Sequence, residues 1–188
     1  MKSSYVWARR DLSTGLGYVQ VDGHTWRKID GYEISVDGDK KWAVNFHVEV
    51  DDKWHTRITR VSVLSSDEDR SLELVADGAG RWTVDGRPSP DLQGCLDVDI
   101  SATPFTNTFV IRRIGLAVGE EISLPVAWVA IPAATVERFE QTYIRHAPID
   151  GYDRYEYRDS RHGAWELTVD HDGVVIEYEG FASRLIDR

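Results

Sequence analysis

The densest group of side chains capable of chemistry lies within residues 95–115, CLDVDISATPFTNTFVIRRIG. This segment combines two carboxylates, four hydroxyls, one amide and two guanidinium groups with eight large apolar residues. A surface loop would carry fewer apolar side chains, and a dry core strand would carry fewer polar ones. Because buried polar groups need hydrogen-bonding or charged partners, this composition predicts a polar site that is at least half buried.

Asp97 and Asp99 are two residues apart on a predicted strand. Both carboxylates therefore point to one face, about 6–7 Å apart at the backbone. Carboxylates at about this separation serve glycoside hydrolysis, one as the acid and the other as the base or nucleophile. The alternative, which carries more weight, is that they pair with Arg112 and Arg113 and neutralise buried charges of both signs.

Hydroxyl and amide groups follow in residues 103–108, TPFTNT. Thr106 and Asn107 could hydrogen-bond the hydroxyls of a sugar or the head group of a lipid. Either residue could equally cap a short helix through Phe109–Ile114, since Thr and Asn side chains accept hydrogen bonds from the first backbone N–H groups of a helix. The two roles are compatible, and the sequence leaves both open.

Four arginines, Arg57, Arg60, Arg112 and Arg113, could hold a carboxylate or phosphate head group. The chain contains 22 Lys and Arg against 32 Asp and Glu, a net charge of −10, so salt bridges are the simpler role for these arginines. The same charge repels phosphate backbones, and no run of basic residues is longer than two. No nucleic-acid partner is therefore expected.

Other common site types lack their sequence patterns. The six histidines show no HxH, HExxH or HxxxH spacing and Cys95 is the only cysteine, so we predict neither a metal centre nor a cofactor. A single cysteine also excludes an intrachain disulfide and favours a reducing compartment. The sequence has no apolar run of signal-peptide or membrane-spanning length, and we expect a cytoplasmic protein.

Apolar and polar residues alternate along most of the chain, as in strands with one buried face. Turn signals such as Asp-Gly separate these runs at residues 22–23, 37–38, 77–80 and 85–86. Short strands of this kind predict a single all-β domain over residues 1–188, mainly antiparallel and built as a barrel, roll or sandwich with few short helices.

Two segments are less regular. The stretch 54–64 has polar residues on both faces, which predicts a strand beside a polar cavity. The stretch 135–146 fits helical and strand spacing alike, and its β-rich surroundings favour a strand. Seven tryptophans lie on nearly every predicted strand. Most must fill a core, but this enrichment also suits the walls of a cavity for an acyl chain or a sugar face.

Several segments together resemble the bacterial putative glycolipid-binding family. The resemblance is carried by GRWTVDG at 80–86, LQGCLDVDI at 92–100, TPFTNTFVIRRI at 103–114, QTY at 141–143 and the tyrosine-rich stretch 153–157. It implies a spiral β-roll similar to the half-barrels of envelope lipoprotein carriers, and binding of a glycolipid without enzymatic activity. The head-group residues that it implies are Asp97, Asp99, Thr106, Asn107, Arg112 and Arg113, with Arg60, Trp82 and Gln141 nearby.

Three functions are therefore open. The first is non-enzymatic binding of a glycolipid or similar amphiphile in a cavity of the curved sheet. The second is a carbohydrate-active hydrolase that uses Asp97 and Asp99. The third is a structural or protein-interaction domain in which the polar stretch ties the fold together and no small ligand binds.

Overall fold

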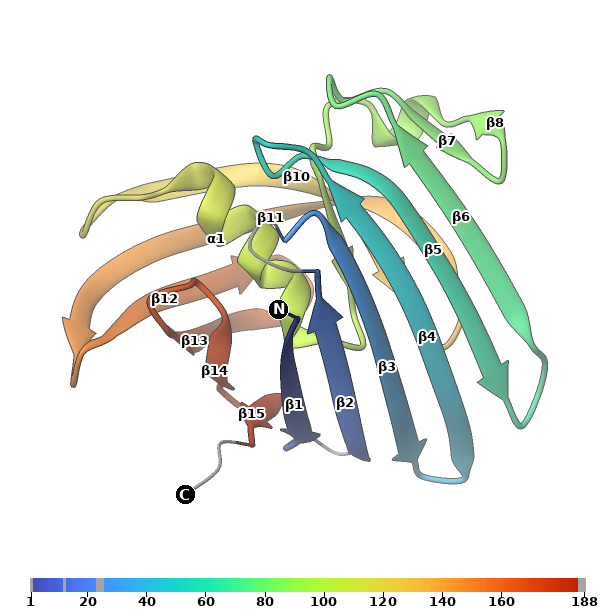
Figure 1. The fold of residues 1–188 in the computed structure, drawn as a ribbon, viewed down its shortest axis with the longest axis horizontal. Helices are drawn as coiled ribbons and strands as arrows, with labels where there is room; N and C mark the ends of the chain where they lie inside the picture. The colour runs from blue at the N-terminus through green and yellow to red at the C-terminus, as the bar shows by residue number, and fades with distance from the viewer. Residues whose placement is uncertain (1, 12, 23–25, 186–188) are drawn as a thin grey trace.

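The computed structural model describes residues 2–11, 13–22 and 26–185, and its strands form one curled sheet (Figure 1). Fifteen strands lie in the order β8-β7-β6-β5-β4-β3-β2-β1-β15-β14-β13-β12-β11-β10-β9. They are β1 (Ser3–Arg9), β2 (Thr14–Val21), β3 (Lys28–Asp37), β4 (Lys40–Val50), β5 (Thr56–Ser65), β6 (Arg70–Ala76), β7 (Trp82–Val84), β8 (Arg87–Pro88), β9 (Asp97–Ile100), β10 (Glu121–Ala130), β11 (Thr135–Ile149), β12 (Tyr152–Asp159), β13 (Gly163–Val169), β14 (Val175–Tyr178) and β15 (Ala182–Arg184).

The sheet consists of two meanders that join where β1 pairs with β15. Every pairing is antiparallel except that of β9, which lies parallel to β10 at one edge. The chain reaches β9 from the opposite edge at β8 through the short helix η1 (Pro90–Leu92). The curl brings β9 back to the start of β5, where Val98 N donates to Thr56 Oγ1 (3.0 Å) and Thr56 N donates to Leu96 O (2.9 Å). The predicted all-β roll is confirmed.

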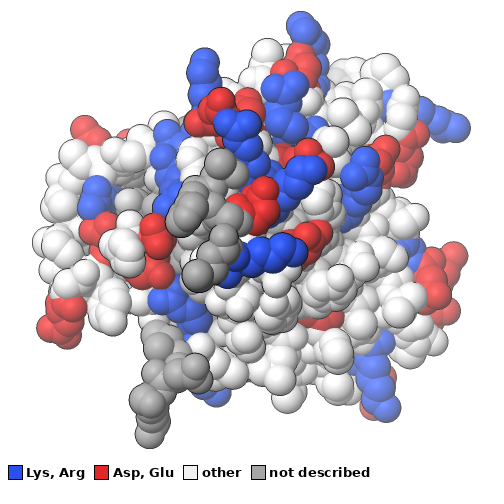
Figure 2. Space-filling view, viewed as in Figure 1, with Lys and Arg blue, Asp and Glu red and all other residues white. Residues whose placement is uncertain are grey.

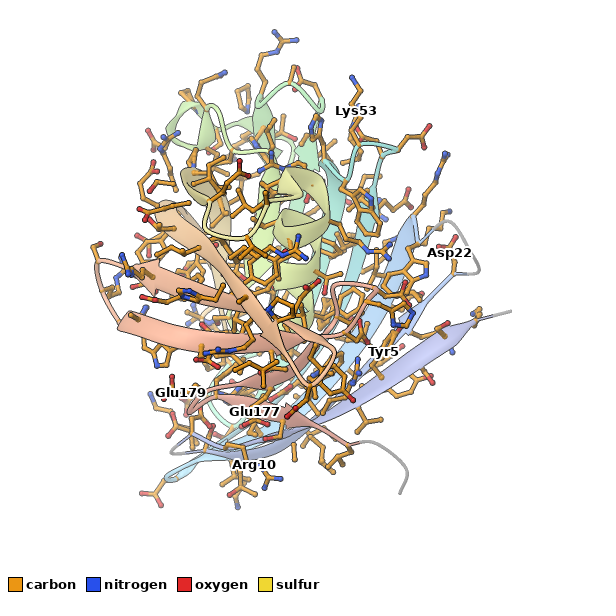
Figure 3. The ribbon with its side chains drawn as sticks, turned by 90° about the vertical axis from the view of Figure 1, so that its left-hand side faces the viewer. Tyr5, Arg10, Asp22, Lys53, Glu177 and Glu179 are labelled. Carbon is orange, nitrogen blue, oxygen red and sulfur yellow. The ribbon has the colours of Figure 1, made fainter. Side chains whose placement is uncertain are left out.

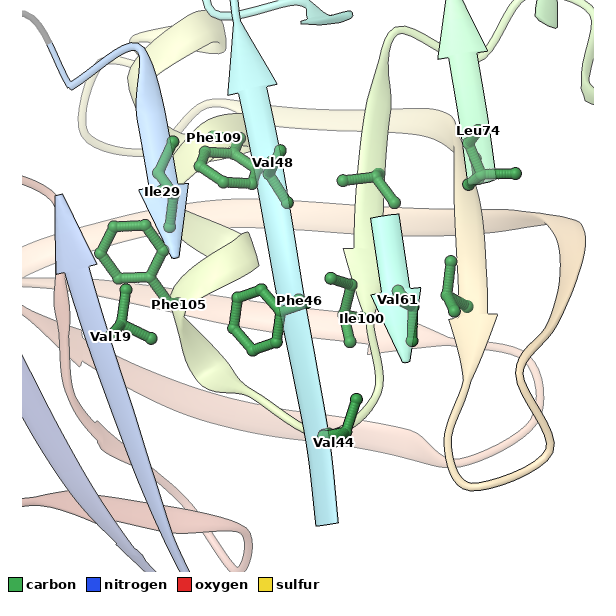
Figure 4. Packing of buried hydrophobic residues seen from close by; sticks show 14 of the residues in the cluster. Val19, Ile29, Val44, Phe46, Val48, Val61, Leu74, Ile100, Phe105 and Phe109 are labelled. Atoms are coloured by element: carbon green, nitrogen blue, oxygen red, sulfur yellow. The ribbon is translucent and has the colours of Figure 1, made fainter. Parts of the chain in front are cut away.

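A short helical segment fills the inside of the curl. It consists of η2 (Pro104–Thr106) and α1 (Asn107–Ile114). Phe105 and Phe109 are fully buried, in the same core cluster as residues of β2, β3 and β4 (Figure 4). The helical turn is capped by Thr103, whose Oγ1 accepts a hydrogen bond from Phe105 N (3.2 Å). The segment is helical as predicted, but the side chains of Thr106 and Asn107 make tertiary contacts instead of caps.

Aromatic side chains bridge the helical segment to the first strand. Tyr5 of β1, labelled in Figure 3, has its ring centroid 5.9 Å from that of Trp26 and 6.0 Å from that of Phe105. Trp26 and Phe105 stack at 6.2 Å. Because aromatic side chains contribute large buried areas, these contacts fix the position of η2 and α1 against the sheet.

The two irregular stretches have different outcomes. The strand over 135–146 is confirmed as part of β11. The expectation that 54–64 lines a polar cavity fails for β5, which presents Val61 and Val63 to the core and Arg60 and Leu64 to solvent. Trp54, which precedes β5, does border a polar hollow, together with Arg112 and Asp172. The mixed pattern has a local cause: the pairing of β4 with β5 shifts register at a bulge before Ile58, and a bulge changes which residues face inward.

The turn signals are used as predicted where the structure describes them. Asp85 and Gly86 link β7 to β8 with φ of 48° and 75°, the two positive φ values of a tight hairpin. Gly38 has φ of 58° between β3 and β4. Gly23 lies outside the described residues. Within residues 2–11, 13–22 and 26–185, no helix has the length and apolar character needed to cross a membrane.

Candidate ligand-binding cavity

A cavity of about 560 Å³ lies beside the segment that the sequence singled out. The end of β9, the following loop and the first residue of α1 form one side. Strands β10, β12, β13 and β14 and the turns that follow β12 and β14 form the other. Its lining residues are Asp11, Asp99, Ile100, Ser101, Thr103, Asn107, Trp128, Tyr157, Asp159, His162, Trp165, Tyr178, Gly180 and Phe181. A volume of this size suits a small ligand.

The wall on the β10–β14 side is a chain of neighbouring aromatic rings. Ring centroids are separated by 6.2 Å for Trp128–His162, 6.3 Å for His162–Trp165 and 6.5 Å for Trp165–Tyr178. Phe181 continues the chain at 5.1 Å from Tyr178. Trp128, Trp165 and Tyr178 lie on strands of the sheet, whereas His162 and Phe181 come from the turns that follow β12 and β14. Aromatic faces of this kind suit the C–H faces of a sugar or an apolar group.

A buried hydrogen-bond network forms the opposite side. Asp99 Oδ1 accepts from Thr106 Oγ1 (2.7 Å), and Asp99 Oδ2 accepts from Gln141 Nε2 (2.6 Å). The hydroxyl of Tyr143 donates to Asn107 Oδ1 (2.8 Å) and lies 3.3 Å from Gln141 Oε1. All five side chains are buried. Because β9, β11 and the start of α1 each contribute, the network fixes the floor of the cavity rigidly.

Asp99 is the exceptional member of this network. Its relative exposure is 9%, and among the described residues it forms no ion pair with a lysine or arginine. Burial raises the pKa of the Asp99 carboxyl, the hydrogen bonds from Thr106 and Gln141 oppose this rise, and the nearby carboxylates of Asp159 and Asp97 reinforce it. Asp99 therefore presents a carboxyl group held only by neutral donors.

Asp159 has the opposite environment. It accepts hydrogen bonds from the backbone N of Arg161 (2.8 Å) and His162 (2.6 Å) and from the hydroxyl of Tyr157 (2.9 Å). Burial opposes ionisation, but these bonds outweigh it and lower the pKa of the Asp159 carboxyl. The ring of His162 adds a contact of 3.1 Å from Nδ1 to Asp159 Oδ2. The cavity thus has two carboxyl groups with pKa values shifted in opposite directions.

Asp97 and the two arginines of α1 lie outside the cavity lining. Arg113 Nη2 donates to Asp97 Oδ2 (2.6 Å), and Arg113 Nε lies within 3.1 Å of both carboxylate oxygens. Arg112 donates to Asp172 O (2.6 Å), and its guanidinium carbon lies 4.4 and 4.6 Å from the ring centroids of Trp26 and Trp54. Both arginines are therefore engaged by the protein itself.

The structure brings together part of the residue set implied by the resemblance. Asp99 and Asn107 line the cavity, and Thr106 and Gln141 donate hydrogen bonds to the carboxylate of Asp99. Besides Asp97, Arg112 and Arg113, two further members of the set lie outside the cavity. Arg60 pairs with Glu73 (2.7 Å) at the exposed face of β5, and Trp82 is buried in the core.

Trp82 has a structural contact that also involves the single cysteine. Its Nε1 donates to Cys95 O (2.8 Å). Cys95 is buried, and burial raises the pKa of its thiol to about 11. Such a thiol is a weak nucleophile at neutral pH.

Sequence reasoning missed most of the aromatic wall. Of the seven tryptophans, only Trp128 and Trp165 line this cavity. Tyr157 and Tyr178 come from two further strands, and His162 comes from a turn. The tryptophan and tyrosine content was the available signal, but strand order is needed to say which rings meet. Among the described residues, no group of three or more His, Cys, Asp or Glu side chains could hold a metal ion.

Comparison with known proteins agrees with this architecture. The family model described as Putative glycolipid-binding matches residues 4–184. The crystal structure of a DUF1089 family protein from Pseudomonas aeruginosa is similar, with a TM-score of 0.80 and 31% sequence identity, over 90% of this chain and 92% of that chain.

A second structure shares the fold alone. It is the beta-barrel-like protein of DUF1849 from Brucella abortus, with a TM-score of 0.54 and 11% identity, over 100% of this chain and 97% of that chain. No curated protein matches the sequence. The family match spans nearly the whole chain, and the chain therefore belongs to the putative glycolipid-binding family.

Proposed function

We propose that the protein binds the polar head group of a glycolipid or similar amphiphile in the 560 Å³ cavity and catalyses no reaction there. The family description supports an amphiphilic ligand. The observation that carries the proposal is the combination of an aromatic wall with a fixed polar floor in one cavity. This combination suits a ligand whose rings have both apolar faces and hydroxyl edges.

Each side of the cavity matches one part of a sugar. The rings of Trp128, Trp165 and Tyr178 offer faces to the C–H groups. On the other side, Asp99 and Asn107 offer oxygen and nitrogen atoms to hydroxyl groups. Because the floor is already held by hydrogen bonds from Thr106, Gln141 and Tyr143, a ligand would meet groups that need little rearrangement, which favours affinity.

A second hollow of about 290 Å³ lies next to the cavity and shares Asp11 and Ser101 with it. Its walls combine apolar side chains, among them Trp42 and Ile131, with charged ones, among them Arg9 and Asp37. A substituent that extends from a bound head group in this direction would meet a surface of mixed polarity.

The arrangement favours binding over hydrolysis by the two β9 carboxylates. Paired carboxylates in a glycosidase both face the scissile bond. Here Asp97 has a relative exposure of 0% and is bidentate with Arg113, so only Asp99 of the pair reaches the cavity.

Calorimetric titration with octyl β-glucopyranoside below its micelle concentration tests the proposal. We expect saturable binding to the wild type and about tenfold weaker binding to Trp165→Ala, since loss of one stacking ring removes roughly 1.4 kcal/mol. The control is Tyr32→Ala, which removes an aromatic side chain that is 53% exposed on β3 and does not line the cavity. Equal affinity of the Trp165→Ala and wild-type proteins would contradict the proposal.

A further inference from the structure

Among the Asp, Glu, Lys and Arg residues, those that line the cavity are all acidic, and His162 lines it beside Asp159. Asp11, Asp99 and Asp159 supply carboxyl groups, and neither lysine nor arginine is among the described lining residues. A cavity with this balance disfavours phosphate, sulfate and carboxylate head groups, because like charges in a partly buried site repel strongly.

Two guanidinium groups lie near the aromatic wall, and each is already paired. Arg9 is paired with Asp11 and with Glu33, and its guanidinium carbon lies 4.7 Å from the ring centroid of Phe181. Arg161 donates to both carboxylate oxygens of Glu137 (2.8 and 3.1 Å). The charges of both guanidinium groups are therefore offset by acidic partners, and the pair with Arg9 offsets the charge of Asp11 in turn.

Asp99 lacks a lysine or arginine partner among the described residues, although its relative exposure is only 9%. Each of its oxygens accepts one hydrogen bond from a neutral group, whereas a carboxylate offers about four acceptor positions. Asp99 itself lines the cavity, so a ligand bound there lies next to this residue. A buried carboxylate without a counter-ion is costly, and a cationic group bound beside it recovers part of that cost.

We propose that the head group bound in this cavity carries a protonated amine and that Asp99 is its counter-ion. The ligand class is an amphiphile with an amino sugar or a similar amine-bearing head. The aromatic wall suits the same group, because Trp and Tyr rings attract cations over their faces. This inference rests on the proposed function and adds the charge of the ligand to it.

A matched pair of glycosides tests the inference. The probes are octyl 2-amino-2-deoxy-β-glucopyranoside and its N-acetylated form, which share the ring and the alkyl chain but differ in charge. At neutral pH we expect the wild-type protein to bind the free amine at least tenfold more tightly than the N-acetylated form, because a charge-assisted hydrogen bond is about twice as strong as a neutral one.

Variants assign the preference to Asp99. We expect Asp99→Asn to bind both glycosides with similar affinity, since the amide keeps the shape of the side chain and removes its charge. The control, Asp39→Asn, makes the same change in an exposed turn between β3 and β4 and should keep the wild-type preference. Far-UV circular dichroism establishes that each variant is folded, and the wild-type comparison of the two glycosides holds even if Asp99→Asn does not fold.

The outcomes separate this inference from the proposed function. Equal binding of both glycosides to the wild type, with weaker binding to Trp165→Ala, would overturn the amine preference and leave head-group binding in place. A preference that persists in a folded Asp99→Asn protein would overturn the role of Asp99. Failure of both glycosides to bind would overturn the proposed function and this inference with it.

Discussion

Asp97 and Asp99 are identical residues on one strand, yet their chemistry differs because their partners differ. Asp97 is held by the guanidinium of Arg113, whereas Asp99 is held by a hydroxyl and an amide. The sequence predicted pairing of this carboxylate pair with Arg112 and Arg113. Successive residues on a helix are rotated by about 100°, so the two arginines cannot both face β9, and Arg112 instead contacts Asp172.

Glu33 gives a prediction at the residue scale. It lies on β3 with a relative exposure of 2%, and its only ion pair among the described residues is with Arg9 (3.2 Å). Burial raises the pKa of the Glu33 carboxyl to about 7, and Arg9 opposes the rise. Between the ordinary pKa of a glutamate and this value, the folded protein holds a proton that the unfolded chain has lost, so this group destabilises the fold as the pH rises.

We therefore expect Glu33→Gln to remove one pH-dependent contribution to stability. The free energy of unfolding of the variant, relative to the wild type, should rise by about 1–3 kcal/mol between pH 4.5 and pH 7.5. Urea denaturation at a series of pH values measures this difference. Arg9 keeps Asp11 as a partner in the variant. A difference in stability that stays constant over this range would contradict the assignment.

The sequence located the polar floor of the cavity but not its aromatic wall. Asp99, Thr106 and Asn107 lie close together in the chain, so their composition alone indicated a site. Trp165 and Tyr178 are remote from them in sequence and reach the cavity only through the order of the strands. Residue types that are common in every β core give no local signal for a binding surface.

At the scale of elements, β3 depends on a glycine that the sequence analysis did not single out. Gly31 lies opposite Phe46 of β4, and the ring of Phe46 lies over it. A Cβ atom at Gly31 would lie 2.0 Å from Phe46 Cζ, far inside van der Waals contact. An aromatic ring over a glycine on a neighbouring strand is a recurrent way of covering the exposed backbone.

We expect Gly31→Ala to reduce the free energy of unfolding by about 1–3 kcal/mol, because the Phe46 ring must leave its position in the core. Chemical denaturation measures the loss. The double variant Gly31→Ala/Phe46→Leu completes a thermodynamic cycle, and its loss should be smaller than the sum of the two single losses. An additive result, or a Gly31→Ala protein as stable as the wild type, would contradict this account of the packing.

The sequence predicted which segments are strands more readily than which side chains of a strand face the core. Alternation in β-rich surroundings predicted the strand over 135–146 correctly. The same reasoning did not predict which residues of β5 face the core. A bulge near Ile58 changes which side chains point inward, and the alternation of residue types does not reveal where a bulge lies.

At the scale of the whole molecule, the fold is one sheet. Its first and last strands in the chain, β1 and β15, pair with each other in the interior of the sheet. Local sequence cannot predict that β1 pairs with β15, because this contact joins residues from opposite ends of the chain. The resemblance to a family supplied the roll. The curl then creates the cavity, since it places the loop after β9 and the start of α1 against side chains of β10, β12, β13 and β14.

Surface charge gives no competing site on the face in Figure 2, where acidic and basic side chains are interspersed. Pairs such as Arg60–Glu73 and Arg154–Glu166 keep opposite charges adjacent. The cavity differs from this surface. Its described lining combines aromatic rings and His162 with aspartates, and it includes no lysine or arginine. This contrast makes the cavity the central feature of the functional account.

Native mass spectrometry of freshly purified protein, followed by solvent extraction and analysis of any bound molecule, tests the central claim most directly. The account predicts that wild-type protein carries, or takes up from a panel of glycolipids, close to one amphiphile per chain, and that Trp165→Ala retains clearly less. A wild-type protein that is free of bound amphiphile and gains no mass from any member of the panel would contradict it.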